Sequence, residues 1–186
     1  VDHARAMGKL AADGEFIEAV QLRKEVQVLC ALRNGQFGVA GWNRMVEQKL
    51  GMNAANQWYL GRPVLVSSND RTTGLYNGDV GIVCANSDGS RVAAFSGTDE
   101  KFRFPVTRLP DVETVHALTI HKSQGSEYEH AIVVLPTHES RILTRELLYT
   151  GATRARTKLT IIATPEVISL SVKNPIRRAT GLARRL

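Results

Sequence analysis

Two polar segments in the second half of the chain carry residue types that can bind phosphate and ribose. The first covers residues 119–128 and follows an apolar stretch that predicts a strand. Polar loops that contain glycine are common ligand sites when they lie at the carboxyl ends of parallel strands. Thr119, Ser123 and backbone N–H groups suit phosphate oxygens, Glu127 suits a ribose hydroxyl, and Gly125 lets the backbone approach a ligand closely. The competing interpretation is an ordinary solvated turn.

The second segment covers residues 146–156 and ends in two arginines, Arg154 and Arg156. It falls within a predicted helix that contains Gly151, and a glycine inside a helix costs ~1 kcal/mol relative to alanine. We therefore expect another element to pack closely against that glycine. The arginines could contact a ligand phosphate, or they could be surface cations placed favourably at the helix C-terminus.

The order and spacing of these segments resemble a known family. The first segment, T-x-H-x-x-Q-G-x-E, is similar to motif V of superfamily 1 helicases, and the second, L-Y-x-x-x-T-R-A-R, is similar to motif VI. Residues 30–43 and 61–81 resemble the RecD branch of that superfamily. The resemblance covers roughly residues 25–165.

The resemblance implies a role for each matching position. Arg154 would be the catalytic motif VI arginine that reaches the γ-phosphate of ATP across an inter-domain cleft. The other cofactor-binding residues would be Gln124, Gly125 and Glu127, and the DNA-binding residues would be Thr119, His121 and Ser123. Arg33 receives no γ-phosphate role, because the family's motif IV arginine is expected upstream. Asn43 and the Asn69-Asp70 pair receive no assigned role.

Apolar runs alternating with helical patterns predict an α/β fold. Buried strands are expected over 26–32, 131–135 and 159–163, and residues 115–120 are also strand-like. Helices are expected over 3–24 with a break at Asp13-Gly14, over 41–50, over 141–156 and after Pro165. The family form of this fold is a RecA-like parallel sheet of the P-loop NTPase type, the second motor domain of a helicase.

The middle of the chain has a different character. Short β-rich pieces at 63–67, 80–85, 91–95 and 101–106 are separated by turn signals, which predicts antiparallel hairpins in a small barrel. The RecD branch carries an SH3-like barrel insertion in its second RecA-like domain. We therefore predict a RecA-like domain over 1–63 and 111–186, with the SH3-like insertion over 64–110.

The composition limits the classes of protein that fit. The 186 residues carry 24 Lys and Arg against 18 Asp and Glu, a net charge of +6 that suits a polyanionic partner. Cys30 and Cys84 lie in apolar runs without metal-ligand spacing, so we expect buried, reduced cysteines, no metal site and a cytoplasmic protein. No apolar run approaches the ~20 residues of a membrane span. The chain starts without Met, which suggests a fragment.

The ATP-binding motifs of a complete motor are not found in the sequence. Gly8-Lys9 lacks a partner glycine and is followed by Leu10, so it is no P-loop. Asp99-Glu100 imitates a Walker B pair but is predicted to lie in a turn. ATP with Mg²⁺ would therefore be bound mainly by an absent N-terminal RecA-like domain, and the fragment alone should not hydrolyse ATP.

The resemblance implies a function and partners. The full protein would be an ATP-dependent 5′→3′ DNA helicase, the alpha subunit of exodeoxyribonuclease V, acting in double-strand break repair and recombination. Its partners would be single-stranded DNA, its own N-terminal domain and RecB- and RecC-type subunits, and any nuclease chemistry would belong to a partner. The alternatives are a stand-alone RecD-like or relaxase-type helicase and a non-catalytic DNA- or protein-binding domain. The helicase interpretation requires the 119–128 loop and Arg154 to emerge along a common edge of one sheet.

Overall fold

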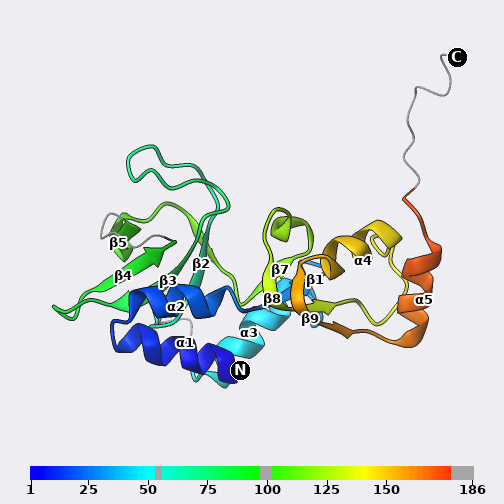
Figure 1. The fold of residues 1–186 in the computed structure, drawn as a ribbon, viewed down its shortest axis with the longest axis horizontal. Coiled ribbons are helices and arrows are strands. Elements are labelled where there is room, and N and C mark those ends of the chain that lie inside the picture. Colours follow the sequence, from blue (N-terminus) through cyan, green and yellow to red (C-terminus); the bar gives the residue numbers. More distant parts are fainter. Residues whose placement is uncertain (53–55, 97–101, 177–186) are drawn as a thin grey trace, which may run out of the picture.

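The computed structural model describes residues 1–52, 56–96 and 102–176, and it contains two β-sheets side by side (Figure 1). The first sheet has four parallel strands in the spatial order β7 (Ala117–Thr119), β1 (Val26–Cys30), β8 (Tyr128–Val134) and β9 (Ala155–Ile162). A parallel sheet with helices confirms the predicted α/β class.

Helices cover both faces of the parallel sheet. The helices of the chain are α1 (Asp2–Ala12), α2 (Phe16–Arg23), α3 (Val39–Lys49), α4 (Arg145–Ala152) and α5 (Pro165–Lys173). Successive side chains of a strand face opposite sides, so Val133 packs with α4 and α5 while Val134 packs with α3. The described residues also form the short 3-10 helices η2 (Val106–Arg108) and η3 (His121–Ser123).

The second sheet is antiparallel. Its strand order is β5 (Arg103–Pro105), β4 (Arg91–Phe95), β3 (Val80–Ala85), β2 (Pro63–Val66) and β6 (Val112–Thr114). These strands lie close to the predicted β-rich pieces, because turns at Asn77-Gly78 and Asn86–Gly89 separate them as the sequence indicates. The start of the predicted 101–106 strand and the Asp99-Glu100 turn lie outside the described residues, as does most of the basic tail.

Two contacts cross the boundaries of the predicted domains. The first two helices, α1 and α2, pack against β3 and β4 of the antiparallel sheet, where Ala11, Ala19, Ile82 and Cys84 share one core. The strand β6 pairs with β2 of this sheet although it lies beyond residue 110. The apolar face of α1 thus serves the second sheet, and the division at 63/64 and 110/111 stays a prediction.

The expectation of a buried strand over 159–163 is wrong. The strand β9 is paired on only one side in the described sheet, and Leu159 and Ile162 are 40% and 37% exposed. Its apolar composition matches a central strand, but its position in the strand order leaves one long side without a neighbour. By contrast, both cysteines are buried and free as predicted, and burial raises the pKa of each thiol to about 12.

A clamp of polar side chains fixes the segment 114–117, which leads from the antiparallel sheet into the parallel sheet. The amide of Asn43 donates to the Thr114 carbonyl at 2.9 Å and accepts from the Ala117 N–H at 2.8 Å. Gln27 donates to the His116 carbonyl at 3.1 Å, and Arg62 donates to the Thr114 hydroxyl at 2.9 Å. Asn43, which has no role assigned from its sequence context, therefore bonds both to the last residue of β6 and to the first residue of β7.

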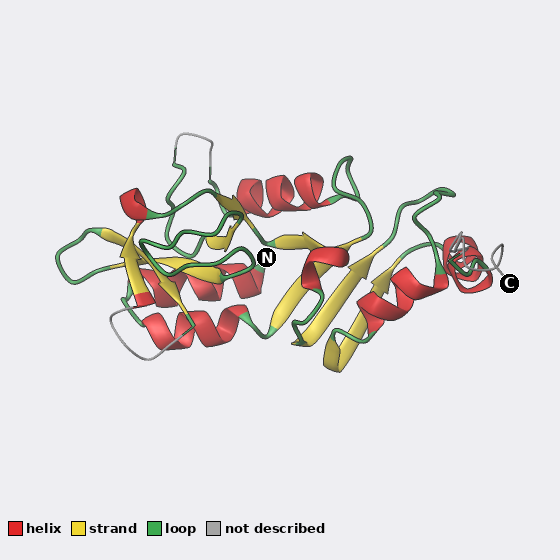
Figure 2. Ribbon diagram, turned by 90° about the horizontal axis from the view of Figure 1, so that it is seen from above, coloured by secondary structure: helices red, strands yellow, loops and turns green. Residues whose placement is uncertain are grey.

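Within the described ranges, no helix is long and apolar enough to cross a membrane. The same residues contain no group of three His, Cys, Asp or Glu side chains that could hold a metal ion. Figure 2 shows the two sheets from above, with the loop that contains η3 lying over the parallel sheet.

Candidate functional site

The first site segment begins where β7 ends. The Thr119 hydroxyl accepts from the Lys122 N–H at 3.2 Å, which closes the turn of η3. The Ser123 hydroxyl donates to the Ile120 carbonyl at 2.7 Å, and Ser123 is fully buried. A hydroxyl that is buried and already bonded to backbone cannot contact a DNA strand in this conformation. The structure therefore gives Ser123 a role in shaping the loop, and the predicted DNA contact does not fit its position.

Gly125 has the backbone conformation that the loop needs. Its φ of +86° lies in the left-handed region, where side chains with a Cβ are strained. A Cβ built there would meet no atom within 4 Å, so the space beside this backbone is open. Gln124 and Glu127 on either side are exposed, as are His121 and Lys122. The loop therefore presents open backbone and polar side chains, as the sequence predicts for a ligand-contacting segment.

The second site segment is the helix α4 and the residues after it. The Thr144 hydroxyl caps the helix by accepting from the Leu147 N–H at 3.2 Å. The glycine at 151 faces the sheet, where a Cβ would lie 3.1 Å from Val133 Cγ2 and 3.3 Å from Ile120 Cδ1. This confirms the expected close packing and shows its purpose. Without a side chain at 151, α4 comes close to the start of the 120–127 loop.

Arg154 joins the two segments. Its guanidinium donates to the Ser126 carbonyl at 3.0 Å, to the Thr150 carbonyl at 3.1 Å and to the Thr153 hydroxyl at 3.2 Å. The Tyr128 N–H donates in turn to the Arg154 carbonyl at 2.8 Å. The guanidinium is half-buried, and the three oxygens that it contacts are uncharged. Neutral oxygens therefore hold it in position without a carboxylate that an incoming anion would have to replace.

Glu127 is paired with the second arginine of the motif. Arg156 Nε donates to Glu127 Oε2 at 2.9 Å, and Arg156 also lies 3.7 Å from Glu129. The hydrogen bond to Glu127 raises the pKa of Arg156 above its ordinary value. Glu127 lies next to Ser126, the partner of Arg154. For Glu127 to accept from a ribose, it must share its oxygens with Arg156.

The two ends of the 120–127 loop lie at different edges of the parallel sheet. Tyr128 and Ala155 are register partners, so Ser126, Glu127 and Arg154 lie at the amino ends of β8 and β9, here called the amino edge. Thr119 is level with Cys30 and Val134 at the opposite, carboxyl edge. Because β8 is seven residues long, the two edges are about 20 Å apart.

The expectation of a common edge is therefore correct for the end of the loop and wrong for its start. The loop follows a strand that ends at the carboxyl edge and must return to the amino edge before β8 can run parallel to β7. It makes this return over the face that carries α4, which packs against η3.

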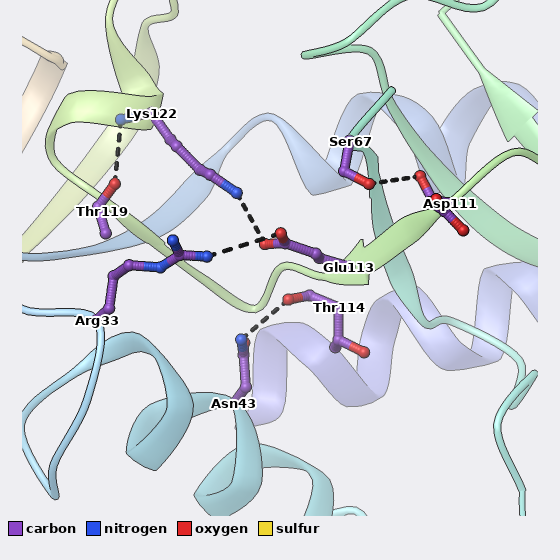
Figure 3. Close-up of polar contacts among 8 residues, drawn as sticks. All are labelled: Arg33, Asn43, Ser67, Asp111, Glu113, Thr114, Thr119 and Lys122. Carbon is purple, nitrogen blue, oxygen red and sulfur yellow. Dashed lines mark hydrogen bonds and ion pairs between the residues drawn. The ribbon is translucent and has the colours of Figure 1, made fainter. Parts of the chain in front are cut away.

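The carboxyl edge carries a cluster that the sequence analysis did not assign. Lys122 Nζ lies 2.8 Å from Glu113 Oε2, and Arg33 lies 3.9 Å from Glu113 Oε1, so that Glu113 sits between the two cations (Figure 3). The position of Arg33 could have been inferred from the sequence, because Arg33 directly follows the predicted strand 26–32 and Thr119 lies at the end of the predicted strand 115–120. Parallel strands end at the same edge, so their trailing residues meet.

Comparisons with known proteins agree with the motif assignment. Residues 114–162 match the model of the UvrD-like helicase C-terminal domain. The RecBCD enzyme subunit RecD of Mycolicibacterium smegmatis is 44% identical over 100% of this chain and 34% of its own length. RecD of Haemophilus influenzae is 36% identical over 92% of the chain and 27% of that protein. The chain thus spans about a third of the length of the relatives it matches.

Two further matches have lower sequence identity to this chain. The ATP-dependent RecD2 DNA helicase of Deinococcus radiodurans is 30% identical over 70% of this chain and 19% of its own length. The structure of a Bacteroides Pif1 helicase bound to single-stranded DNA covers 78% of this chain and 44% of that chain. Its identity is 20% and its TM-score 0.47, too low to support a conclusion.

Proposed function

Because this chain belongs to the RecD family, we propose that it is the C-terminal motor domain of an ATP-dependent 5′→3′ DNA helicase. The full protein would be the alpha subunit of exodeoxyribonuclease V and would act in double-strand break repair and recombination. The observation that carries the proposal is the 3.0 Å contact between Arg154 and Ser126, which unites the motif V and motif VI segments at one edge of the sheet. The higher identity to RecD subunits than to RecD2 favours a subunit over a stand-alone helicase.

The amino edge would form half of an ATP site. Arg154 offers a cation for phosphate, and Glu127 offers an acceptor for a ribose hydroxyl. The open backbone at Gly125 allows a ligand to come close, so the three together fit a nucleotide. As negative charge develops on the transferring phosphoryl group, Arg154 would exchange a neutral carbonyl for a phosphate oxygen. Arginines of this kind contribute on the order of 10³–10⁵-fold to the rate.

Mg²⁺ would supply charge neutralisation at the phosphates from another part of the full protein. Among the described residues, no group of three His, Cys, Asp or Glu side chains could hold it. The chain's own part is to contact the phosphate and ribose and to close the cleft against an N-terminal RecA-like domain.

The carboxyl edge would contact single-stranded DNA through Thr119 and His121. His121 is exposed in η3, and Thr119 ends β7 beside the cations of Figure 3. The five antiparallel strands are compatible with the SH3-like insertion of the family. We further propose RecB- and RecC-type partner subunits and a cytoplasmic location.

The test is replacement of Arg154 by alanine in the full-length protein. We expect DNA-stimulated ATP hydrolysis to fall by about 10³-fold or more, while the affinity for single-stranded DNA in the absence of nucleotide stays near normal. The matched control is Arg156→Ala, which removes an equal charge two residues away and should reduce turnover far less. Retained turnover in the Arg154 variant would remove the catalytic role.

A further inference from the structure

A polar groove of about 890 Å³ runs between α3 and β6, beside the junction of the two sheets. Its cationic lining residues come from three places in the sequence: Arg33 follows β1, Arg44 lies on α3, and Arg62 precedes β2. The acidic residues Glu47 and Glu113 lie on its walls. Of these, Glu113 is the one that contacts cations at the carboxyl edge of the parallel sheet.

The geometry of Glu113 is that of a shared counter-ion. Its Oε2 faces Lys122 and its Oε1 faces Arg33, so each oxygen is directed at a different cation (Figure 3). The cations belong to the parallel sheet, whereas Glu113 belongs to β6 of the antiparallel sheet. The side chains of Arg33, Lys122 and Glu113 are 70%, 35% and 45% exposed. Ion pairs this exposed contribute little to stability, so an incoming anion can replace the carboxylate at small cost.

We propose that Glu113 holds Arg33 and Lys122 in the absence of nucleic acid, and that a phosphodiester group of single-stranded DNA displaces it from them. The inference rests on the proposed function and adds a phosphate-contacting pair with its intramolecular competitor. A phosphodiester resembles this carboxylate in having two oxygens and one negative charge. Both groups accept charge-assisted hydrogen bonds from arginine and lysine in the same geometry.

The position of the cluster favours DNA phosphate over nucleotide phosphate. Lys122 is bonded through its backbone N–H to Thr119, and Arg33 follows β1 at the carboxyl edge. Arg154, the proposed γ-phosphate contact, lies at the amino edge about 20 Å away along the strands. A nucleotide held by Arg154 would therefore not reach this pair, whereas a strand that crosses Thr119 and His121 would.

Removal of the competitor should tighten DNA binding. In Glu113→Gln the side chain keeps its size but loses its charge, so both cations become available without a prior exchange. We expect single-stranded DNA to bind about twofold to tenfold more tightly, as two exposed ion pairs need no longer be broken. In Arg33→Gln we expect weaker binding and a salt dependence reduced by about 0.7 of a unit of slope.

The experiment measures the affinity of the full-length protein for fluorescent oligothymidylate without nucleotide, at several salt concentrations. The matched control is Glu18→Gln, which makes the same change in net charge at an exposed position on α2, a helix that packs against β3 and β4. Thermal unfolding of each variant checks that the fold is retained. The triple variant Glu113→Gln, Arg33→Gln, Lys122→Gln should lose the gain, because the released cations are then absent.

Three results would overturn the inference. The first is Glu113→Gln binding DNA no more tightly than Glu18→Gln does. The second is a gain that persists in the triple variant, which would make it a long-range charge effect. The third is tighter binding of ADP with unchanged binding of oligothymidylate, which would assign the pair to nucleotide.

If the unaltered protein binds no single-stranded DNA, the proposed function fails as well. If only His121→Ala weakens binding, the function stands and this inference fails.

Discussion

The cations proposed to contact phosphate are held in different ways at the two edges of the parallel sheet. At the amino edge, Arg154 donates to two carbonyl oxygens and a hydroxyl, and none of these groups carries charge. At the carboxyl edge, Arg33 and Lys122 share the carboxylate of Glu113. Neutral partners fix the position of a cation without cancelling its field, whereas an acidic partner does both. Arg154 can therefore bind an anion without first losing an acidic partner. Arg33 and Lys122 must first exchange the carboxylate of Glu113 for the incoming anion.

Among these predictions, replacing Asn43 by alanine should have the largest effect, and it should impair the carboxyl edge more than the amino edge. It would leave the Thr114 carbonyl and the Ala117 N–H without their partner, and each such group costs about 1–3 kcal/mol. We expect a loss of about 2–4 kcal/mol in the free energy of unfolding, measured by urea denaturation. Affinity for single-stranded DNA should fall further than affinity for ADP, because Asn43 bonds to Thr114, next to Glu113, and to Ala117, two residues before Thr119. Equal losses of both affinities would contradict a separate role for the two edges.

Lowering the pH should weaken the same junction by a smaller amount. His116 bonds to the Tyr59 hydroxyl at 2.8 Å, and burial, together with the positive charge of Arg62, lowers its pKa to about 4. A folded-state pKa below the unfolded value gives stability that is complete above pH ~6.5 and is lost as pH falls toward 4.

At about 1.4 kcal/mol per pKa unit, this contribution is up to about 3 kcal/mol. Urea denaturation at successive pH values would measure it, and His116→Gln should flatten the profile between these limits. A profile unchanged by the substitution would show that another group titrates. The hydrogen-bond partners of Arg154 are two backbone carbonyls and a threonine hydroxyl, which do not titrate in this range, so we expect no comparable pH effect from these contacts.

The smallest expected effect on stability is that of Glu127→Gln. The pair with Arg156 is more than half exposed on both sides, so its loss should change the free energy of unfolding by less than about 1 kcal/mol. If Glu127 contacts the ribose, the affinity for ATP should fall while the affinity for 2′,3′-dideoxy-ATP changes little. Equal changes for both nucleotides would mean that Glu127 acts only through Arg156.

The sequence predicted local structure well where periodicity and turn residues agree. The break at Asp13-Gly14, the hairpins of the middle section and the close contact at Gly151 are all present. These features depend on neighbours in the sequence or on the volume of one residue. The motif residues around Arg154 were also recognisable from their spacing.

The features that the sequence did not predict depend on strand order and on the path of a loop. An apolar run does not reveal whether a strand is central or at an edge, so the exposure of β9 could not be foreseen. Nor does a polar loop reveal that it returns across the sheet, which separates Thr119 from Glu127. Ser123 looks like any accessible serine until its hydroxyl is seen bonded to the Ile120 carbonyl.

The loop between Thr119 and Tyr128 has a thermodynamic consequence for the proposed motor. It starts at Thr119, packs against α4 through η3 and ends against the guanidinium of Arg154. DNA and nucleotide bound as proposed would therefore contact the two ends of one short segment. Linkage makes such coupling reciprocal. If a bound nucleotide changes the affinity for single-stranded DNA by some factor, bound DNA must change the affinity for the nucleotide by the same factor.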